Sequence, residues 1–183
     1  MITPATSADL EIIATQLGRV PRGVRAVSAR CTCSVPLVVE TEPRLPDGTP
    51  FPTLYYVTDD KLSSVIGTLE ASGVMRDMEE RLRQDATLAV AYQAAHDQYL
   101  AARTAIDDVA EISGVTAGGM PNRVKCLHVL AGHSLSVGVG VNPFGDEAVE
   151  AAASLLAERF AAPIVERLPC THVDRNPTAS VDQ

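Results

Sequence analysis

The spacing of apolar residues changes near residue 59 and divides the chain into a region of predicted strands and a region of predicted helices. Before this point, residues 24–30, 36–40 and 53–57 form short apolar or alternating runs that are typical of strands, with turn residues at 46–48. Beyond it, apolar positions follow helical spacing. This order indicates an α+β fold in which a small antiparallel sheet from the N-terminal third packs against several helices.

Residues that start and stop helices set the expected boundaries. Ser7, Asp85 and Asn142 are good N-caps, and Gly18 and Gly73 can end a helix. The predicted helices therefore cover residues 7–17, 60–72, 74–84, 86–110, 121–136 and 143–161. Pro121 fits the first turn of its helix. We expect a single domain over residues 1–170 and a flexible tail over 171–183.

Composition and charge exclude several function classes. Hydrophobic residues make up 46% of the chain and aromatic residues only 4%, so the core is expected to be aliphatic. The net charge of −8 disfavours nucleic acid and anionic lipid as partners. No apolar stretch approaches the ~20 residues of a membrane span, so no membrane insertion is expected. The abundance of arginine over lysine is typical of a GC-rich bacterial genome.

The N-terminal region gives an expectation about location. Residues 1–17 contain Asp9 and Glu11 and no basic cluster, which does not fit a signal peptide. We therefore expect a cytoplasmic protein. Cysteines remain reduced in that compartment, so the four cysteines are expected to be thiols or thiolates.

Cysteine and histidine residues provide the clearest candidate chemistry. Cys31 and Cys33 are two positions apart, and residues at that spacing point to the same face of a strand. Cys126 and His128 have the same spacing. Zinc prefers thiolate and imidazole ligands, and a structural zinc site takes four of them. The sequence therefore predicts a zinc site made by these four side chains.

The helix predicted over residues 121–136 is a difficulty for this site, because residues two apart on a helix point about 200° away from each other. Cys126 and His128 can share an ion only where residues 124–128 are extended or distorted. Further candidate donors are His133, Cys170 and His172. Two alternatives stay open: the cysteines are small buried thiols without a metal, or one of them is a redox-active or catalytic thiol.

A second candidate site precedes the helix predicted to begin at Pro121. Gly118 and Gly119 allow a ligand to approach the backbone closely, and free N–H groups at a helix start attract anions. Arg123 and Lys125 add positive charge. The pattern predicts a site for a small anion such as phosphate or carboxylate, with an ordinary loop as the alternative. It is not a Walker loop, because the Gly-Lys-Ser/Thr ending is missing.

Two long motifs give the chain a resemblance to a known family. One is Arg30-Cys-Thr-Cys33 followed by Pro50-Phe-Pro-Thr-Leu-Tyr-Tyr-Val-Thr58. The other runs from Gly118 through His128 and His133 to Asn142-Pro-Phe-Gly-Asp-Glu147. Together they resemble the uncharacterised bacterial family called domain of unknown function 501, over about residues 15–170. Its members are often encoded near a septum-formation initiator protein and an exopolyphosphatase, which is an association and not a mechanism.

The resemblance also draws attention to Asp59. Members of the family tend to have a cysteine after the Tyr-Tyr-x-Thr segment, where this chain has Asp59. If that cysteine is a metal ligand, the resemblance implies that Asp59 takes its place or that this chain binds metal differently.

Three functions remain open on the sequence alone. The first is a metal-binding cytoplasmic protein, with zinc favoured. The second is an enzyme that acts on a small anionic or phosphorylated substrate, with Cys126 or a metal-bound water as the nucleophile and Arg123 and Lys125 holding the anion. The third is a non-catalytic interaction protein linked to the cell envelope or to division, which would present an exposed apolar patch.

Overall fold

The core of the fold is a four-stranded antiparallel sheet, seen here in a computed structural model that describes residues 2–172. The strand order is β1-β2-β3-β4. The strands are β1 (Thr3–Pro4), β2 (Val24–Arg30), β3 (Pro36–Thr41) and β4 (Tyr55–Val57). Val39 of β3 pairs with Val27 on one side and with Tyr56 on the other. The α+β architecture expected from the sequence is confirmed.

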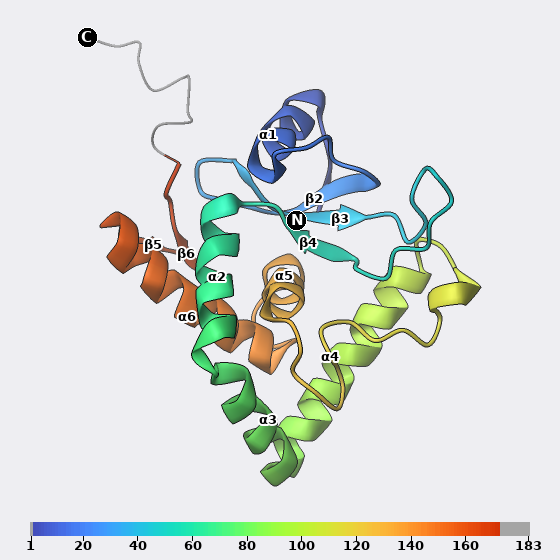
Figure 1. Cartoon of the computed structure of the whole chain (residues 1–183), viewed down its shortest axis with the longest axis vertical. Helices are drawn as coiled ribbons and strands as arrows, with labels where there is room; N and C mark the ends of the chain where they lie inside the picture. The colour runs from blue at the N-terminus through green and yellow to red at the C-terminus, as the bar shows by residue number, and fades with distance from the viewer. Residues whose placement is uncertain (1, 173–183) are drawn as a thin grey trace.

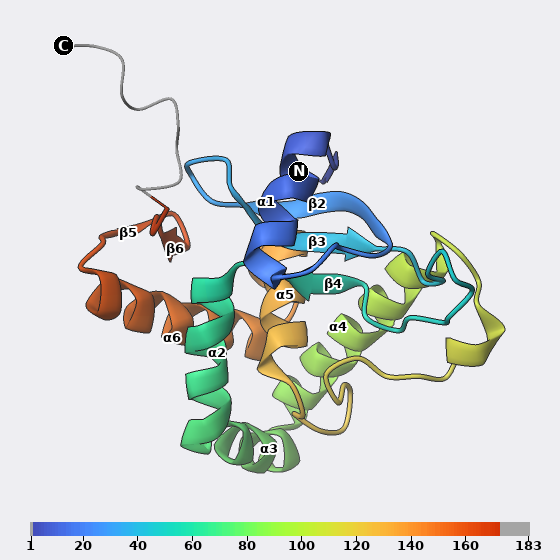
Figure 2. The same ribbon diagram turned by 45° about the horizontal axis from the view of Figure 1, so that its top comes forward.

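Helices cover both faces of this sheet (Figures 1 and 2). Helix α1 lies on one face, and α5 lies against the other, where α2, α4 and α6 surround it. The helices are α1 (Ser7–Leu17), α2 (Asp60–Ser72), α3 (Val74–Gln84), α4 (Ala86–Thr104), α5 (Leu127–Val137) and α6 (Pro143–Phe160), with a 3₁₀ turn η1 (Ala110–Ile112). Within residues 2–172, no helix is long and apolar enough to cross a membrane.

Two glycines allow α5 to lie at the centre of the molecule. A Cβ atom on Gly132 would come within 3.0 Å of the Tyr55 carbonyl oxygen, so α5 approaches β4 closely there. A Cβ atom on Gly145 of α6 would lie 2.3 Å from the Leu130 carbonyl oxygen. The two helices therefore touch backbone to backbone. Side chains from α5 that face these neighbours, such as Leu127 and Leu130, are fully buried.

Two predicted helix boundaries are wrong. The helix expected from Pro121 begins at Leu127 instead, and the helix expected to reach residue 110 ends at Thr104. Residues 118–126 form a closed loop, because the N–H groups of Lys125 and Cys126 donate to the Gly118 carbonyl oxygen. The α5 helix starts where the Glu70 carboxylate accepts the N–H of Leu127, at 2.7 Å.

A short C-terminal segment packs against this core. After α6, the two-residue strands β5 (Ile164–Val165) and β6 (Leu168–Pro169) pair with each other. Thr171 and His172 are buried, and the Lys61 ammonium group donates to the Thr171 carbonyl oxygen. The tail expected from residue 171 thus begins with two packed residues, and its remainder, 173–183, lies outside the described residues.

Candidate metal centres

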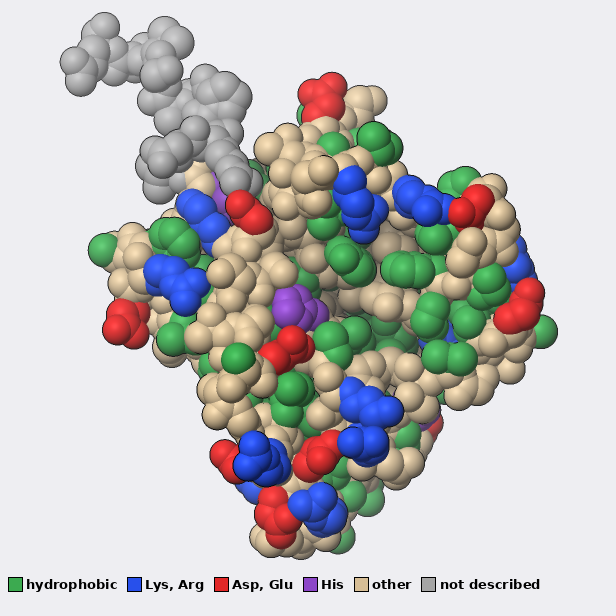
Figure 3. All heavy atoms as spheres, in the orientation of Figure 1, with side chains coloured by type: hydrophobic (Ala, Val, Ile, Leu, Met, Phe, Trp, Pro, Cys, Tyr) green, Lys and Arg blue, Asp and Glu red, His purple; other side chains and the backbone are tan. Residues whose placement is uncertain are grey.

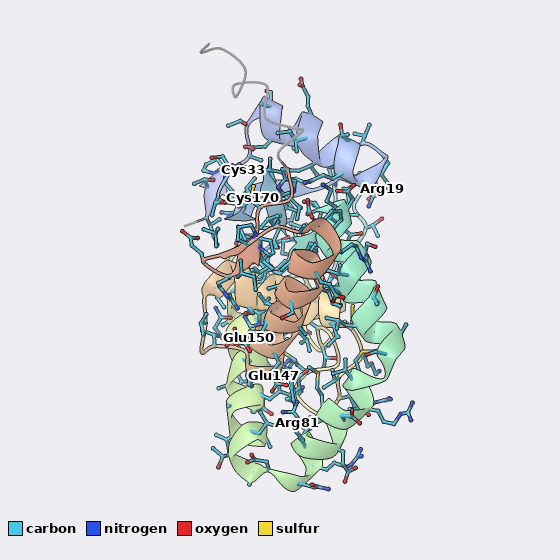
Figure 4. The ribbon with its side chains drawn as sticks, turned by 90° about the vertical axis from the view of Figure 1, so that its left-hand side faces the viewer. Arg19, Cys33, Arg81, Glu147, Glu150 and Cys170 are labelled. Carbon is cyan, nitrogen blue, oxygen red and sulfur yellow. The ribbon has the colours of Figure 1, made fainter. Side chains whose placement is uncertain are left out.

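Four potential metal ligands converge where the turn between β2 and β3 meets the C-terminal segment. The sulfur atoms of Cys31, Cys33 and Cys170 and a ring nitrogen of His172 all lie within 4.8 Å of one another. We call these four residues the first cluster. Figure 4 shows Cys33 and Cys170 close together, one from the turn and the other from the segment that follows β6.

The β2–β3 turn holds its two cysteines close together through the backbone. The N–H of Ser34 donates to the Cys31 carbonyl oxygen at 2.8 Å, and the N–H of Cys31 donates to the Val35 carbonyl oxygen at 2.9 Å. Ser34 has a φ of 71°, in the left-handed region. Cys31 and Cys33 therefore meet through a tight turn, and not because they share one face of a strand as predicted.

Asp59 orients the imidazole ring of His172. The Nε2 atom of His172 lies 2.7 Å from Oδ2 of Asp59, and Nδ1 lies 3.5 Å from Sγ of Cys33. A carboxylate can only accept, so Nε2 carries a proton. Nδ1 faces the sulfur atoms, where a bound metal ion would take the place of the ring's second proton. The other oxygen of Asp59 accepts the N–H of Leu62 and caps α2, which fixes the carboxylate. Ligand histidines in metal sites commonly have this arrangement.

The surroundings of the first cluster shift two pKa values. Burial alone lowers the pKa of His172, but the hydrogen bonds and negative charges of Asp59 and Cys31 outweigh burial and raise it to about 10. The backbone N–H of His172 is the largest influence on Cys170 and, with the hydroxyl and thiol groups nearby, lowers the pKa of this thiol to about 7. The lowered pKa favours the thiolate form of Cys170, the form of cysteine that binds metal.

Glu70 of α2 and Cys126 and His128 at the start of α5 form a second cluster. One potential ligand atom from each lies within 4.8 Å of the others. His128 Nδ1 lies 3.2 Å from Glu70 Oε1, and Nε2 lies 3.1 Å from the Ser63 carbonyl oxygen. The hydrogen bond with Cys126 raises the pKa of His128 more than burial lowers it, and with the contribution of Glu70 the value reaches about 9.

The second cluster opens into a pocket of about 330 Å³. Its wall is formed by residues from β4, α2 and α5 and from the chain just before β4: Thr53, Tyr55, Tyr56, Val57, Ser63, Cys126, His128 and Val129. Figure 3 shows a hollow in this face of the molecule, bordered mainly by hydrophobic side chains. A small molecule could reach Cys126 and His128 from this side.

The four predicted zinc ligands thus fall into two clusters instead of one. Cys31 and Cys33 lie with Cys170 and His172, whereas Cys126 and His128 lie with Glu70. The expectation that one ion joins all four is therefore replaced by two separate ligand sets. Cys170 and His172 repeat the Cys-x-His spacing of Cys126 and His128, a signal that the sequence offered twice. No sequence signal marked Glu70, which reaches Cys126 only through the packing of α2 against α5.

His133 and Asp59, which the sequence offered as further metal ligands, are not among the converging donor atoms of either cluster. Both ring nitrogens of His133 are engaged, since Nδ1 accepts from the Asn142 amide at 3.1 Å and Nε2 donates to Gln98 Oε1 at 2.5 Å. Its ring stacks on Tyr55 in the core. Asp59 contacts the first cluster through His172 and is not among the four converging donors.

The residues of the predicted anion site are arranged differently from the expectation. The premise that a helix begins at Pro121 is wrong. The Gly119 carbonyl oxygen accepts the N–H of Arg123 at 2.9 Å, and a Cβ atom on Gly119 would lie 2.7 Å from the Arg123 carbonyl oxygen. The carboxylate of Glu79 lies 3.6 Å from the Arg123 guanidinium and accepts the N–H of Val124 at 3.1 Å. A carboxylate of the protein itself therefore lies beside Arg123, where the sequence predicted an external anion.

The fold and the two clusters define an α+β protein that gathers thiol, imidazole and carboxylate groups at two places. Residues 27–150 match the family described as "Protein of unknown function (DUF501)", and the chain belongs to this family. No curated protein and no solved structure matches the chain. The matched region includes Cys31, Cys33 and the whole second cluster, whereas Cys170 and His172 lie beyond its end.

Proposed function

We propose that this protein binds zinc through Cys31, Cys33, Cys170 and His172, and that the ion fastens the C-terminal segment to the sheet. The observation that carries the proposal is the convergence of three sulfurs and one imidazole nitrogen within 4.8 Å. Three thiolates and one imidazole are an established ligand set for a structural zinc ion. Cys33 and His172 are 139 positions apart, so the ion would join distant parts of the chain.

The distances within the first cluster suit a tetrahedral ion. With Zn–S bonds of about 2.3 Å and Zn–N bonds of about 2.0 Å, the donors of such a site lie roughly 3.5 Å apart. The separation of Cys33 Sγ and His172 Nδ1 is 3.5 Å. The remaining donors lie within 4.8 Å of one another, and binding of the ion would draw them to the same spacing.

The C-terminal segment is attached to the rest of the fold by side-chain contacts of Arg167, Thr171 and His172, and an ion would add to them. The strands β5 and β6 have two residues each, and an isolated hairpin is at best marginally stable in water. Arg167 ties the hairpin to α5 by donating to the Ser134 carbonyl oxygen at 2.8 Å. Metal binding by residues that are apart in the unfolded chain contributes directly to folding free energy. We therefore expect the ion to hold residues 170–172 in place.

The proposal carries an expectation about location. A site with three thiolates needs reduced cysteines, and these persist in a reducing compartment. The cytoplasm is the location that suits this site.

Metal analysis of protein purified without a histidine tag tests the proposal. We expect about one tightly held zinc ion per chain after dialysis against a weak chelator. Cys33→Ser and Cys170→Ser should each retain less than about 0.2 zinc under the same conditions, because removing one thiolate opens the site. The matched control is Cys126→Ser, which leaves the first cluster unchanged and should keep its tightly held zinc.

Two results would refute the proposal. One is wild-type protein with no retained zinc and with Cys33 or Cys170 found in a disulfide by mass spectrometry, which would make the first cluster a redox site. The other is zinc content that Cys126→Ser abolishes and that Cys33→Ser leaves intact.

A further inference from the structure

The second cluster adjoins the pocket of about 330 Å³ whose wall includes Cys126 and His128. We propose that Glu70, Cys126 and His128 form a second site for a divalent transition-metal ion, with an open coordination position that faces the neighbouring pocket. The ligand that this position suits is the carbonyl or hydroxyl oxygen of a small apolar molecule. The site is independent of the proposed zinc ion at the first cluster and shares none of its residues.

The ring of His128 is oriented as a metal ligand would be. Its Nε2 atom lies 3.1 Å from both the carbonyl oxygen and the hydroxyl oxygen of Ser63, and of these two groups the carbonyl can only accept a hydrogen bond. A proton on Nε2 satisfies that carbonyl, and Nδ1 faces Oε1 of Glu70 at 3.2 Å. Two acceptors at this distance need a shared proton or a shared cation between them. Donors on one tetrahedral ion with bonds of about 2.0 Å lie roughly 3.3 Å apart.

The side chains of the other two ligands, Glu70 and Cys126, both lie at the start of α5. Glu70 Oε1 accepts the N–H of Leu127 at 2.7 Å, which fixes the carboxylate at the start of α5. Cys126 occupies the N-cap position of α5, and its side chain makes no capping hydrogen bond. Its sulfur atom hydrogen-bonds with His128, and an ion bound between the two side chains would replace that bond. The arrangement combines one carboxylate, one thiolate and one imidazole from two helices that pack against each other.

Three protein ligands are the number found in metal sites that keep one position for water or substrate, whereas structural sites use four. The open side of the second cluster is the pocket of about 330 Å³. This volume lies at the lower end of the ~300–1,000 Å³ typical of small-molecule sites. The side chains of Tyr55, Tyr56, Val57 and Val129 give the pocket a largely apolar wall.

Charge balance defines the kind of donor that fits the open position. The Cys126 thiolate and the Glu70 carboxylate together neutralise a divalent ion. An additional anion would leave a net negative charge beside an apolar wall, which is costly. A neutral oxygen donor such as water, an alcohol or a carbonyl compound avoids this cost. The pocket accordingly favours neutral ligands over anions of the same size.

Cobalt titration tests the metal site. The first cluster is loaded with one equivalent of zinc, and Co²⁺ is then added while its visible absorption is recorded. We expect a second equivalent to bind, with a charge-transfer band from a single thiolate. Cys126→Ser should lose this second equivalent and stay folded, because serine is a good N-cap. His128→Gln should lose it as well.

Glu70→Gln provides a matched variant for the carboxylate. The glutamine oxygen can still accept the N–H of Leu127, so α5 keeps its capping partner. The affinity for Co²⁺ should nevertheless fall by at least about tenfold. An unchanged affinity in this variant would remove Glu70 from the ligand set.

A pair of isosteric probes tests the open position. Isobutyramide is neutral, and isobutyrate has the same shape with a negative charge. The amide should shift the d–d bands of the bound Co²⁺ at a lower concentration than isobutyrate does. If neither probe shifts these bands, or if isobutyrate binds more tightly, the proposed open position for a neutral donor is wrong.

The metal-free alternative has its own signature. If wild-type protein binds no second equivalent, and if iodoacetamide alkylates Cys126 at the same rate with and without Zn²⁺, Cys126 and His128 form a metal-free hydrogen-bonded pair and the proposed metal site is overturned. If the protein instead binds only one metal equivalent, and if Cys126→Ser abolishes that binding, the zinc ion proposed at the first cluster is refuted and the second site stands.

Discussion

The titration of His133 gives a sharp test of the buried side of the molecule. This side chain is completely buried, and burial, opposed only in part by the negative charge of Asp146, lowers its pKa from 6.5 to about 4. Its Nδ1 atom accepts from Asn142 and its Nε2 donates to Gln98. The folded protein therefore keeps this histidine neutral, and protonation would break the bond from Asn142.

The effect on stability follows from the difference between the folded and unfolded pKa values. Below pH 6.5 the unfolded chain takes up a proton at His133 that the folded protein refuses, so stability is lost as the pH falls toward 4. At 1.36 kcal/mol per pKa unit, the difference between 6.5 and about 4 corresponds to about 3.4 kcal/mol in all. Between pH 7 and pH 5 the lost part is roughly 1.8 kcal/mol.

Urea unfolding of wild type and His133→Gln at pH 7 and pH 5 isolates this contribution. Circular dichroism follows unfolding, and both proteins are measured at equal concentrations of zinc and reductant. His96, His128 and His172 titrate in both proteins, so their contributions cancel in the comparison. Glutamine can still bond with Asn142 and Gln98 but does not titrate. We expect wild type to lose roughly 1.8 kcal/mol more than the variant between the two pH values. Parallel changes in the two proteins would show that His133 is not a buried neutral group.

Four further substitutions test the packing and the first cluster. Gly145→Ala should lower the free energy of unfolding by about 1–3 kcal/mol, because its Cβ would lie 2.3 Å from the Leu130 carbonyl oxygen. The control Gly67→Ala in α2, where a Cβ would have no atom within 4 Å, should raise the free energy of unfolding by up to about 1 kcal/mol. Equal effects of the two substitutions in thermal unfolding would contradict the close contact of α5 and α6. Tyr99→Phe should cost about 1–3 kcal/mol in urea unfolding, because the N–H of Leu54 donates to the Tyr99 hydroxyl oxygen at 2.6 Å; a neutral result would mean that this N–H finds another acceptor. Asp59→Asn keeps a good N-cap for α2 but should weaken zinc binding about 10–100-fold in competition with a chelator, and unchanged affinity would rule out Asp59 as the residue that orients His172.

Local patterns predicted most of the fold. The strands near residues 24–30 and 36–40 and the helices over residues 60–72 and 74–84 follow directly from apolar spacing and from their caps. The start of α5 could not be read in this way, because it depends on Glu70 of α2 accepting the N–H of Leu127. A contact between residues 57 positions apart leaves no local signal.

The candidate ligands were identified as residue types but were grouped incorrectly. The pairs Cys31 and Cys33, and Cys126 and His128, do lie close together in space. The grouping of the pairs depends on where the segment after α6 returns, and that position is set by tertiary contacts such as Lys61 with Thr171. The second Cys-x-His, at residues 170–172, was the one local sign that the thiols and imidazoles could form two sets.

X-ray absorption at the zinc edge, on Cys126→Ser loaded with one equivalent of zinc, tests the central claim most directly. This variant isolates the first cluster. The account predicts three sulfur neighbours at about 2.3 Å and one nitrogen neighbour at about 2.0 Å. A shell of nitrogen and oxygen atoms alone, or with a single sulfur, would contradict the assignment of zinc to Cys31, Cys33, Cys170 and His172.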